Sequence, residues 1–451
     1  MKKILLTFVS VLLLTQCALA KDDLKLLDKS IRKFDIPKDS VSISVKNIET
    51  GEIVKEINAK VPTSPASTQK MLTYFPSLKV LGENYNFSTK LYRTKNGDFY
   101  IKLGGDPYLT TKDLKALVSN IKLGKWGEIK NLYIDDTILD NKCWGEGWQW
   151  DDDLNTLMPK FGAYNLDKNL YTVIINPTTI DSPADIFTAV FYPTTFINQT
   201  KTATSTNISL SRDNYISPDS ITVNGTVATK TKIQVPVNYL RRYFLLRLDD
   251  SFRSAKLEYY GKYPRAKVPN GAVLIAEIKH PISMATEDVL KNSNNLVAET
   301  VFKLAGGKYT KSTGTEASAM AMFNNYCSTN KIDCSKIRIT DASGVSKNNL
   351  VTSDFMTDYI IATSKIYGLD KVKTLLATAG EGTLKGRMFY LNKKLWAKTG
   401  TLSNISGIAG IISAKSGNNF AFSIYINDGK STDNTKKLLE DVLIKEIYNN
   451  L

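Results

Sequence analysis

Hydrophobic and polar residues follow several distinct patterns along the 451-residue chain, and the changes between them mark its organisation. Residues 22–34 have apolar residues at helical spacing, whereas residues 41–45 and 53–57 alternate as two strands joined by a turn at 49–52. A further helix is predicted from Pro65, because proline fits the first turn of a helix. Pro76 is expected to end or kink that helix after Phe75.

A segment with a different pattern of hydrophobic and polar residues, from about 87 to 269, separates the two ends of the chain. It begins with a predicted hairpin over 91–103 that turns at Asn96-Gly97, a capped helix over 110–121 and a short strand over 132–134. Residues 172–237 lack a helical period and are expected to be mostly β, and residues 238–257 are helical again. We expect an insertion in which residues 89–175 and 240–274 form a second domain and residues 176–239 form a nested, β-rich third domain.

From about residue 274 onward, helices dominate before a final set of strands. Helices are predicted over 286–304, 315–326, 353–367 and 432–448, and strands over 395–401, 408–413 and 420–426. Residues 21–88 and 275–451 together predict one domain of the α+β class. It is expected to be an antiparallel sheet with helices on its faces, interrupted by the insertion.

The first 20 residues have the pattern of an export signal. Lys2-Lys3, the apolar stretch 4–14 and the small residues of Ala18-Leu19-Ala20 predict a signal peptide that is cleaved after Ala20. Gln16 is a poor residue to precede a lipidated cysteine, which disfavours lipidation of Cys17. No later apolar stretch is long enough to span a bilayer. The mature protein is therefore expected in the periplasm, either soluble or in peripheral association with membrane or cell wall.

The formal net charge of +15 comes from scattered lysines and arginines, without a nucleic-acid-binding motif. It indicates a generally basic surface, suited to an anionic matrix such as a cell wall and not to nucleic acid. The single histidine, His280, excludes a histidine-rich metal site and is expected in a loop before a helix. No metal or cofactor is predicted.

The cysteines fit an oxidising compartment. Cys327 and Cys334 are close together in a polar stretch, and we expect them to form a local disulfide. Cys143 would then be left over.

Ser67 and Lys70 are the first candidates for chemistry. They lie three residues apart at the start of a predicted helix, so they share one face and the amine can take the hydroxyl proton. The same Ser-x-x-Lys pattern also begins at Ser30, Ser119 and Ser328, so the spacing alone is a weak signal.

Two further motifs in a fixed order make the assignment more specific. Ser293-Asn294-Asn295 lies between two helical runs, and Lys398-Thr399-Gly400-Thr401 lies on a predicted strand. A serine and lysine opening a helix, then Ser-x-Asn, then Lys-Thr-Gly is the order found in β-lactamases and penicillin-binding proteins.

With these motifs, the sequence resembles the low-molecular-mass class C penicillin-binding proteins, which are D-alanyl-D-alanine carboxypeptidases and endopeptidases. The resemblance covers essentially the whole mature chain and includes Gly105-Asp106-Pro107, residues 147–152 and 292–299, Asp341-x-Ser343-Gly344, Gly380-x-Gly382-Thr383-Leu384 and residues 397–402. Ala342 replaces a usual glycine, and Lys347 stands where the family more often has arginine. The resemblance implies a penicillin-binding transpeptidase/β-lactamase-like fold, peptidoglycan D-Ala-D-Ala stem peptides and cross-links as substrates, and covalent inhibition by β-lactams.

The predicted mechanism gives each motif a role. Ser67 is the nucleophile and Lys70 its base, whose pKa must fall from about 10.4 through burial and the nearby cation of Lys398. Ser293 relays a proton, and Asn295 holds the substrate amide. Backbone N–H groups of Ser67 and Thr401 form the oxyanion hole, and the Lys398-Thr399-Gly400-Thr401 strand binds the terminal carboxylate.

The resemblance also implies a site for the substrate side chain. The loop 148–153 is either a packed aromatic turn or part of this site, in which Asp152 and Phe161 hold the cationic end of diaminopimelate. Asp153 is an alternative to Asp152, because the acidic run 151–153 leaves the alignment open. Lys347 is expected to contact substrate.

Two other functions are compatible with parts of this pattern. A β-lactamase or esterase would use the same Ser-Lys chemistry, but no clear deacylating glutamate loop lies between the first two motifs. A non-catalytic wall-binding protein would have no need for the intact set of Ser67, Lys70, Ser293 and Lys398.

Overall fold

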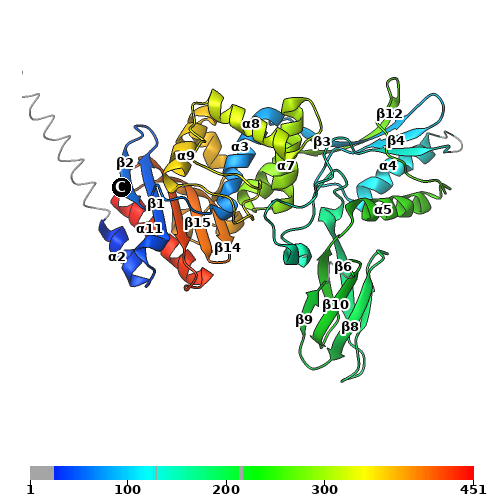
Figure 1. The fold of residues 1–451 in the computed structure, drawn as a ribbon, viewed down its shortest axis with the longest axis horizontal. Helices are drawn as coiled ribbons and strands as arrows, with labels where there is room; N and C mark the ends of the chain where they lie inside the picture. The colour runs from blue at the N-terminus through cyan, green and yellow to red at the C-terminus, as the bar shows by residue number, and fades with distance from the viewer. Residues whose placement is uncertain (1–24, 125, 127–128, 213–216) are drawn as a thin grey trace, which may run out of the picture. The chain divides into compact units, whose positions relative to one another are not determined.

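The computed structural model describes residues 25–124, 126, 129–212 and 217–451. The predicted signal peptide, its cleavage site and Cys17 lie outside these residues. The chain divides into two compact units (Figure 1). The sheet unit contains residues up to Leu78 together with Ala285–Asn294 and Phe323–Leu451, and the inserted unit contains Lys79–Met284 and Asn295–Met322.

The sheet unit is built on a six-stranded antiparallel sheet to which both ends of the chain contribute. The strand order is β13 (Ala377–Thr378), β14 (Leu395–Leu402), β15 (Ile405–Ser413), β16 (Asn419–Asn427), β1 (Val41–Asn47) and β2 (Ile53–Ile57). The two ends of the chain meet where β1 pairs with β16, with Val41 opposite Ile426. The predicted α+β class and the antiparallel sheet formed by both ends of the chain are confirmed.

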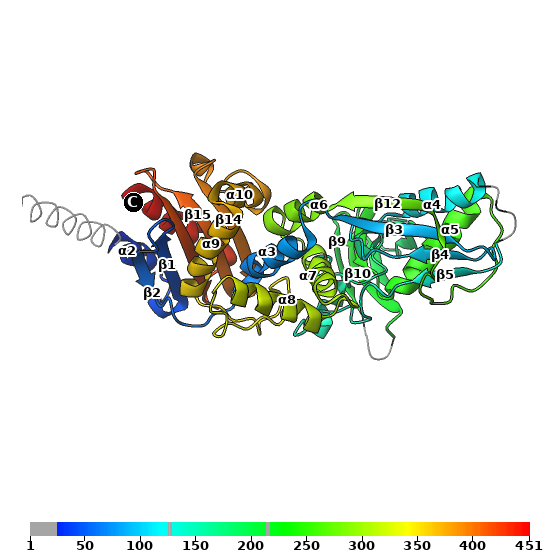
Figure 2. The same cartoon turned by 90° about the horizontal axis from the view of Figure 1, so that it is seen from above.

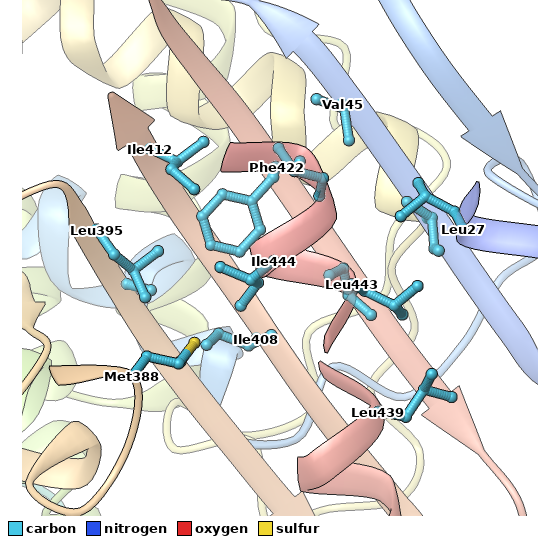
Figure 3. Packing of buried hydrophobic residues seen from close by; sticks show 14 of the residues in the cluster. Leu27, Val45, Met388, Leu395, Ile408, Ile412, Phe422, Leu439, Leu443 and Ile444 are labelled. Carbon is cyan, nitrogen blue, oxygen red and sulfur yellow. The ribbon is translucent and has the colours of Figure 1, made fainter. Parts of the chain in front are cut away.

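The two faces of β1 are buried against different helices, because successive side chains of a strand point to opposite faces. Val41, Ile43 and Val45 join an apolar core with α2 (Lys25–Lys33) and α11 (Asp433–Asn450), shown in Figure 3. On the other face, the hydroxyls of Ser42 and Ser44 lie 2.7 and 2.9 Å from those of Ser353 and Thr357 in α9 (Ser353–Tyr367). The sheet is therefore a middle layer between helices, as Figure 2 shows from above.

The helix α3 (Gln69–Leu81) continues through Pro76, so it does not end after Phe75. A proline has no N–H to donate to the carbonyl four residues earlier, which here is that of Leu72. The hydroxyl of Tyr359 in α9 lies 3.3 Å from the carbonyl oxygens of both Met71 and Leu72. A tertiary hydrogen bond thus replaces the one that Pro76 removes.

The inserted unit contains three sheets. Their orders are β12-β3-β4-β5, β11-β6-β7 and β8-β10-β9. The strands are β3 (Asn86–Arg93), β4 (Phe99–Lys102), β5 (Leu132–Asp135), β6 (Leu170–Asn176), β7 (Asp185–Thr188), β8 (Thr195–Thr202), β9 (Asn207–Ser211), β10 (Ser220–Val227), β11 (Thr231–Pro236) and β12 (Val273–Pro281). The helices α4 (Thr111–Leu123), α5 (Leu240–Ala255) and α7 (Asn295–Thr310) accompany them. The mostly β character predicted for the insertion is confirmed, whereas its division into a second and a third domain stays a prediction.

The strand β12 corrects the prediction that helices dominate from residue 274. It pairs antiparallel with β3, and His280 lies opposite Phe87. His280 is therefore on a strand and not in a loop. Its Nδ1 lies 2.6 Å from Oδ2 of Asp106, a buried carboxylate.

The helix predicted over 286–304 is interrupted at the second motif. The chain forms α6 (Ile282–Thr286) and a π-helical turn (Glu287–Lys291), and α7 (Asn295–Thr310) begins only after the break. Ser293, in the break, has a positive φ of 65°, which a helix cannot contain. The short helix α10 (Leu369–Leu375) was not predicted, whereas α8 (Glu316–Thr329) was.

The predicted disulfide between Cys327 and Cys334 is present. Among the cysteines that the structure describes, Cys143 is outside a disulfide. Within the described part of the chain, no helix has both the length and the apolar character needed to cross a membrane.

Candidate active site

Ser67 lies in a short 3-10 turn (Ala66–Thr68) that leads directly into α3. Both the backbone N–H and the hydroxyl of Thr68 donate to Pro65 O, at 3.2 and 2.7 Å. Thr68 Oγ1 also lies 3.0 Å from the hydroxyl of Tyr425 in β16. Ala66 has a φ of 47°, a strained conformation for a residue with a β-carbon. These contacts fix Ser67, which is partly exposed, at the beginning of the helix.

Lys70 lies one turn further on and faces the Ser67 side chain, as the spacing predicts. Its Nζ is 2.9 Å from Ser67 Oγ and 2.6 Å from the backbone oxygen of Ser343. The Lys70 side chain is fully buried. A hydroxyl and an amine at this distance form the pair that a serine nucleophile with a lysine base requires.

A second hydroxyl–amine pair joins the other two motifs. Lys398 Nζ on β14 donates to Ser293 Oγ at 2.8 Å and to Thr399 O at 2.7 Å. Burial, and then the charge of Lys70, lower the pKa of Lys398 well below its ordinary value of 10.5. The influence of one lysine on the other, expected from the sequence, is therefore seen at Lys398. The lowered pKa expected for Lys70 stays a prediction.

The strand β14 packs closely on the turn that carries Ser67. Leu395 and Ala397 point into the apolar core, so Lys398 and Gly400 face the opposite side of the sheet. A β-carbon on Gly400 would lie 2.8 Å from the backbone nitrogen of Ser67. Only glycine lets the strand approach this closely, and the approach puts the Gly400 backbone beside the Ser67 N–H.

The 3-10 turn Gly382–Leu384 connects the segment before Ser293 to β14. A β-carbon on Gly382 would lie 2.3 Å from Lys291 O, and Lys291 Nζ forms an ion pair with Glu381 at 3.0 Å. Thr399 Oγ1 donates to Thr383 Oγ1 at 2.7 Å. The sequence motif around Gly382 was recognised, but no role in the site was assigned to it.

Residues 24–445 match the D-Ala-D-Ala carboxypeptidase 3 (S13) family. The chain belongs to this family. It is therefore a hydrolase of the serine-type D-Ala-D-Ala carboxypeptidase class.

Individual relatives agree with the family. The D-alanyl-D-alanine carboxypeptidase DacB of Haemophilus influenzae is 23% identical, and the match covers 91% of each chain. The crystal structure of penicillin binding protein 4 from the same organism is similar with a TM-score of 0.83 at 22% identity, covering 94% of this chain and 99% of that one. The same penicillin binding protein complexed with a novel β-lactam gives a TM-score of 0.79 at 21% identity, with the same coverage of both chains.

Three other predicted site residues of this S13 carboxypeptidase are Asn295, Lys347 and Thr401. Asn295 opens α7 in the inserted unit, and its Nδ2 donates to Leu157 O at 2.8 Å. Lys347 is exposed, just after the turn that begins at Asp341. Thr401 is exposed on β14, next to Gly400.

The acidic run 151–153 of the S13 carboxypeptidase lies in a 3-10 turn (Trp150–Leu154) of the inserted unit. Asp153 is buried and accepts a hydrogen bond from Arg212 Nη1 at 2.6 Å. Asp152 is only half-buried. The ion pair gives Asp153 a structural task, which leaves Asp152 as the better candidate for a substrate contact.

The predicted contact of Phe161 with substrate stays a prediction. Its side chain is fully buried, packs edge-on against Trp148 at 5.9 Å between ring centroids, and has Lys303 Nζ 5.4 Å from its ring. It packs in the core of the inserted unit and also lines a cavity of that unit, together with Cys143 and Tyr164. The sequence pattern alone cannot separate a packed aromatic residue from one that contacts substrate, because an aromatic residue in an aromatic loop fits both roles.

Proposed function

We propose that this S13 carboxypeptidase removes the terminal D-Ala from peptidoglycan stem peptides through an acyl-enzyme at Ser67, and that it also cleaves D-Ala cross-links as an endopeptidase. The 2.9 Å contact between Ser67 Oγ and the buried amine of Lys70 carries this proposal. Its support is the second pair, Lys398 and Ser293, on the neighbouring strand and turn.

The proposed mechanism gives each of these residues one step. Lys70 takes the Ser67 proton while Ser67 Oγ bonds to the carbonyl carbon of the penultimate D-Ala. The resulting oxyanion is stabilised by the Ser67 N–H and by the backbone of β14 at Gly400 and Thr401. The C–N bond then breaks, and Ser293 relays the proton taken up by Lys70 to the departing D-Ala amine, which leaves Lys70 neutral again. Water then gives a proton to Lys70 as it attacks the ester, and Lys70 returns this proton to Ser67 Oγ as the ester bond breaks and the shortened peptide leaves.

Lys398 has two proposed tasks that require different charges. With its lowered pKa it can exchange a proton with Ser293, which favours the neutral amine. Binding the terminal carboxylate of the substrate together with Thr399 favours the ammonium. We infer that the arriving carboxylate raises the pKa of Lys398 again, so that proton uptake accompanies substrate binding.

The same chemistry explains the proposed partners and location. A β-lactam resembles an acylating substrate, and the related penicillin binding protein 4 has been crystallised with one. The basic chain, with a formal net charge of +15, suits an anionic cell wall. We propose that the mature protein works in the periplasm, on peptidoglycan.

Acylation by labelled penicillin tests the nucleophile. The wild-type protein should be labelled and Ser67→Ala should not, while Ser328→Ala, which alters an exposed serine of another Ser-x-x-Lys sequence, should be labelled like the wild type. Label retained by Ser67→Ala would refute the assignment, and rapid turnover of the penicillin would indicate a β-lactamase. Mass spectrometry of cross-linked muropeptides then separates loss of one D-Ala from splitting of dimers.

A further inference from the structure

The turn of residues 341–344 lies against the start of α3 through three consecutive carbonyl oxygens. Gln69 Nε2 donates to Asp341 O at 3.5 Å, Thr73 Oγ1 to Ala342 O at 2.8 Å, and Lys70 Nζ to Ser343 O at 2.6 Å. These contacts all belong to the sheet unit. The shortest of them reaches the amine that we propose as the base.

The carboxylate of Asp341 shapes this turn from within. It is only 5% exposed, and it accepts hydrogen bonds at 2.7–3.1 Å from the backbone N–H groups of Gly344, Val345 and Ser346 and from the side chains of Ser343 and Asn349. A carboxylate that accepts from consecutive backbone N–H groups fixes their directions, and with them the directions of the carbonyls between them. The Ser343 carbonyl therefore has little freedom to turn away from Lys70.

Close packing holds the turn of residues 341–344 against the segment before Ser67. Gly344 has a φ of 82°, and a β-carbon there would lie 1.9 Å from Ala66 O. The turn thus touches the segment before Ser67 as well as Lys70 itself. Its position and the position of the Ser67–Lys70 pair are coupled.

We propose that Asp341 is a positioning residue for the Ser67–Lys70 pair. By fixing the Ser343 carbonyl, it holds one N–H of the Lys70 amine away from Ser67, which raises the share of orientations in which the nitrogen lone pair faces the Ser67 hydroxyl. A neutral amine free to rotate would spend much of its time with an N–H toward Ser67, which cannot take a proton. This inference rests on the proposed function, because it requires Lys70 to be the base.

The variant Asp341→Asn tests this role. Each carboxylate oxygen accepts from at least one backbone N–H, so either orientation of an amide places its NH2 group against donors. We expect the rate constant for acylation by labelled penicillin to fall about 100-fold, the loss that a misplacement of about 1 Å produces. The pH dependence of acylation should also change, since the Lys70 environment changes.

Asp428→Asn is the matched control. Asp428 is also 5% exposed, in the sheet unit, and its carboxylate holds the backbone N–H groups of Lys430 and Ser431 in a loop after β16. Both variants should lower the thermal midpoint, but Asp428→Asn should be acylated at the wild-type rate per folded molecule. Equal acylation rates and pH profiles for Asp341→Asn and Asp428→Asn would overturn the proposal.

A milder variant covers the case in which Asp341→Asn does not fold. Thr73→Val removes the donor to Ala342 O and so loosens the contact between α3 and the turn that presents the Ser343 carbonyl to Lys70. It should slow acylation about fivefold to tenfold, as expected for the loss of one hydrogen bond, and an unchanged rate would contradict the proposal. If the wild-type protein itself carries no label at Ser67, the proposed function fails instead, so the two failures are distinguishable.

Discussion

Gly400 lies so close to Ser67 that a β-carbon on it would come within 2.8 Å of the Ser67 backbone nitrogen. The two residues are on different elements, β14 and the turn before α3. The N–H of Ser67 is one donor of the proposed oxyanion hole, and the strand that carries Gly400 supplies the other. The size of residue 400 therefore sets the width of the proposed oxyanion site.

We expect Gly400→Ala to reduce acylation by labelled penicillin about 100-fold, because the added methyl group must push β14 away from the Ser67 N–H. The measurement is the second-order acylation rate constant, with circular dichroism as a check on folding. Gly386→Ala is the control, since a β-carbon there meets open space. Acylation of Gly400→Ala at the wild-type rate would show that this contact does not shape the site.

Lys398→Met should abolish acylation and yet stabilise the protein at neutral pH. Burial and the charge of Lys70 lower the pKa of Lys398 in the folded state, so between that lowered pKa and about 10.5 the unfolded chain holds a proton that the folded chain lacks. The free energy of unfolding therefore rises with pH across this window. Below the lowered pKa, the buried charge of Lys398 destabilises the folded state most.

The difference in unfolding free energy between Lys398→Met and wild type should then be about 1–3 kcal/mol near pH 6 and should shrink toward pH 10. Urea unfolding at a series of pH values measures it. Lys415→Met, at an exposed position, should show no such pH-dependent gain. A constant difference at every pH would contradict the buried-cation explanation.

We expect Asp153 to stabilise the fold and Asp152 to contact substrate. Asp153→Asn breaks a buried ion pair with Arg212, whose side chain is 3% exposed, and should cost about 3–5 kcal/mol of stability. Asp152→Asn should leave stability nearly unchanged. It should instead lower kcat/KM about tenfold for stem peptides with a free diaminopimelate amine, and not for peptides in which that amine is acetylated. The reverse pattern would assign the contact to Asp153.

The Tyr359 hydroxyl should stabilise the fold because it compensates for the backbone N–H that Pro76 lacks. Tyr359→Phe should cost about 1–2 kcal/mol of stability, since the Leu72 carbonyl loses the donor that substitutes for a backbone N–H. In Pro76→Ala, residue 76 regains an N–H that can reach Leu72 O, so the same tyrosine change should cost about 1 kcal/mol less. A double-mutant cycle from urea unfolding measures this difference. Strictly additive effects would show that the two residues do not share this carbonyl.

The candidate site was largely predictable, because its motifs are local. Ser67 and Lys70 share a helical face by spacing alone, and the Lys398 motif lies on a strand that the alternation predicts. The short spacing of Cys327 and Cys334 likewise indicated their disulfide, which the structure contains. The order of the three motifs along the chain was enough to select Ser67 from four equivalent patterns.

The errors concern features that distant contacts decide. The strand β12 exists because β3 offers it a partner, and α3 passes Pro76 because Tyr359 supplies a hydrogen-bond donor. None of these partners is a neighbour in sequence, so the local pattern around each residue contained no signal for them.

By itself, the sequence determined which residue types stand at the start of a helix, in a helix break and on a strand, since propensity and periodicity act over a few residues. Only the tertiary structure decided that Lys398 meets Ser293 across 105 residues, that burial lowers the pKa of Lys398, and that Ser343 supplies the carbonyl that Lys70 contacts. These depend on burial and on distances between segments far apart in the chain. Both quantities arise only when the two ends of the chain close into one sheet.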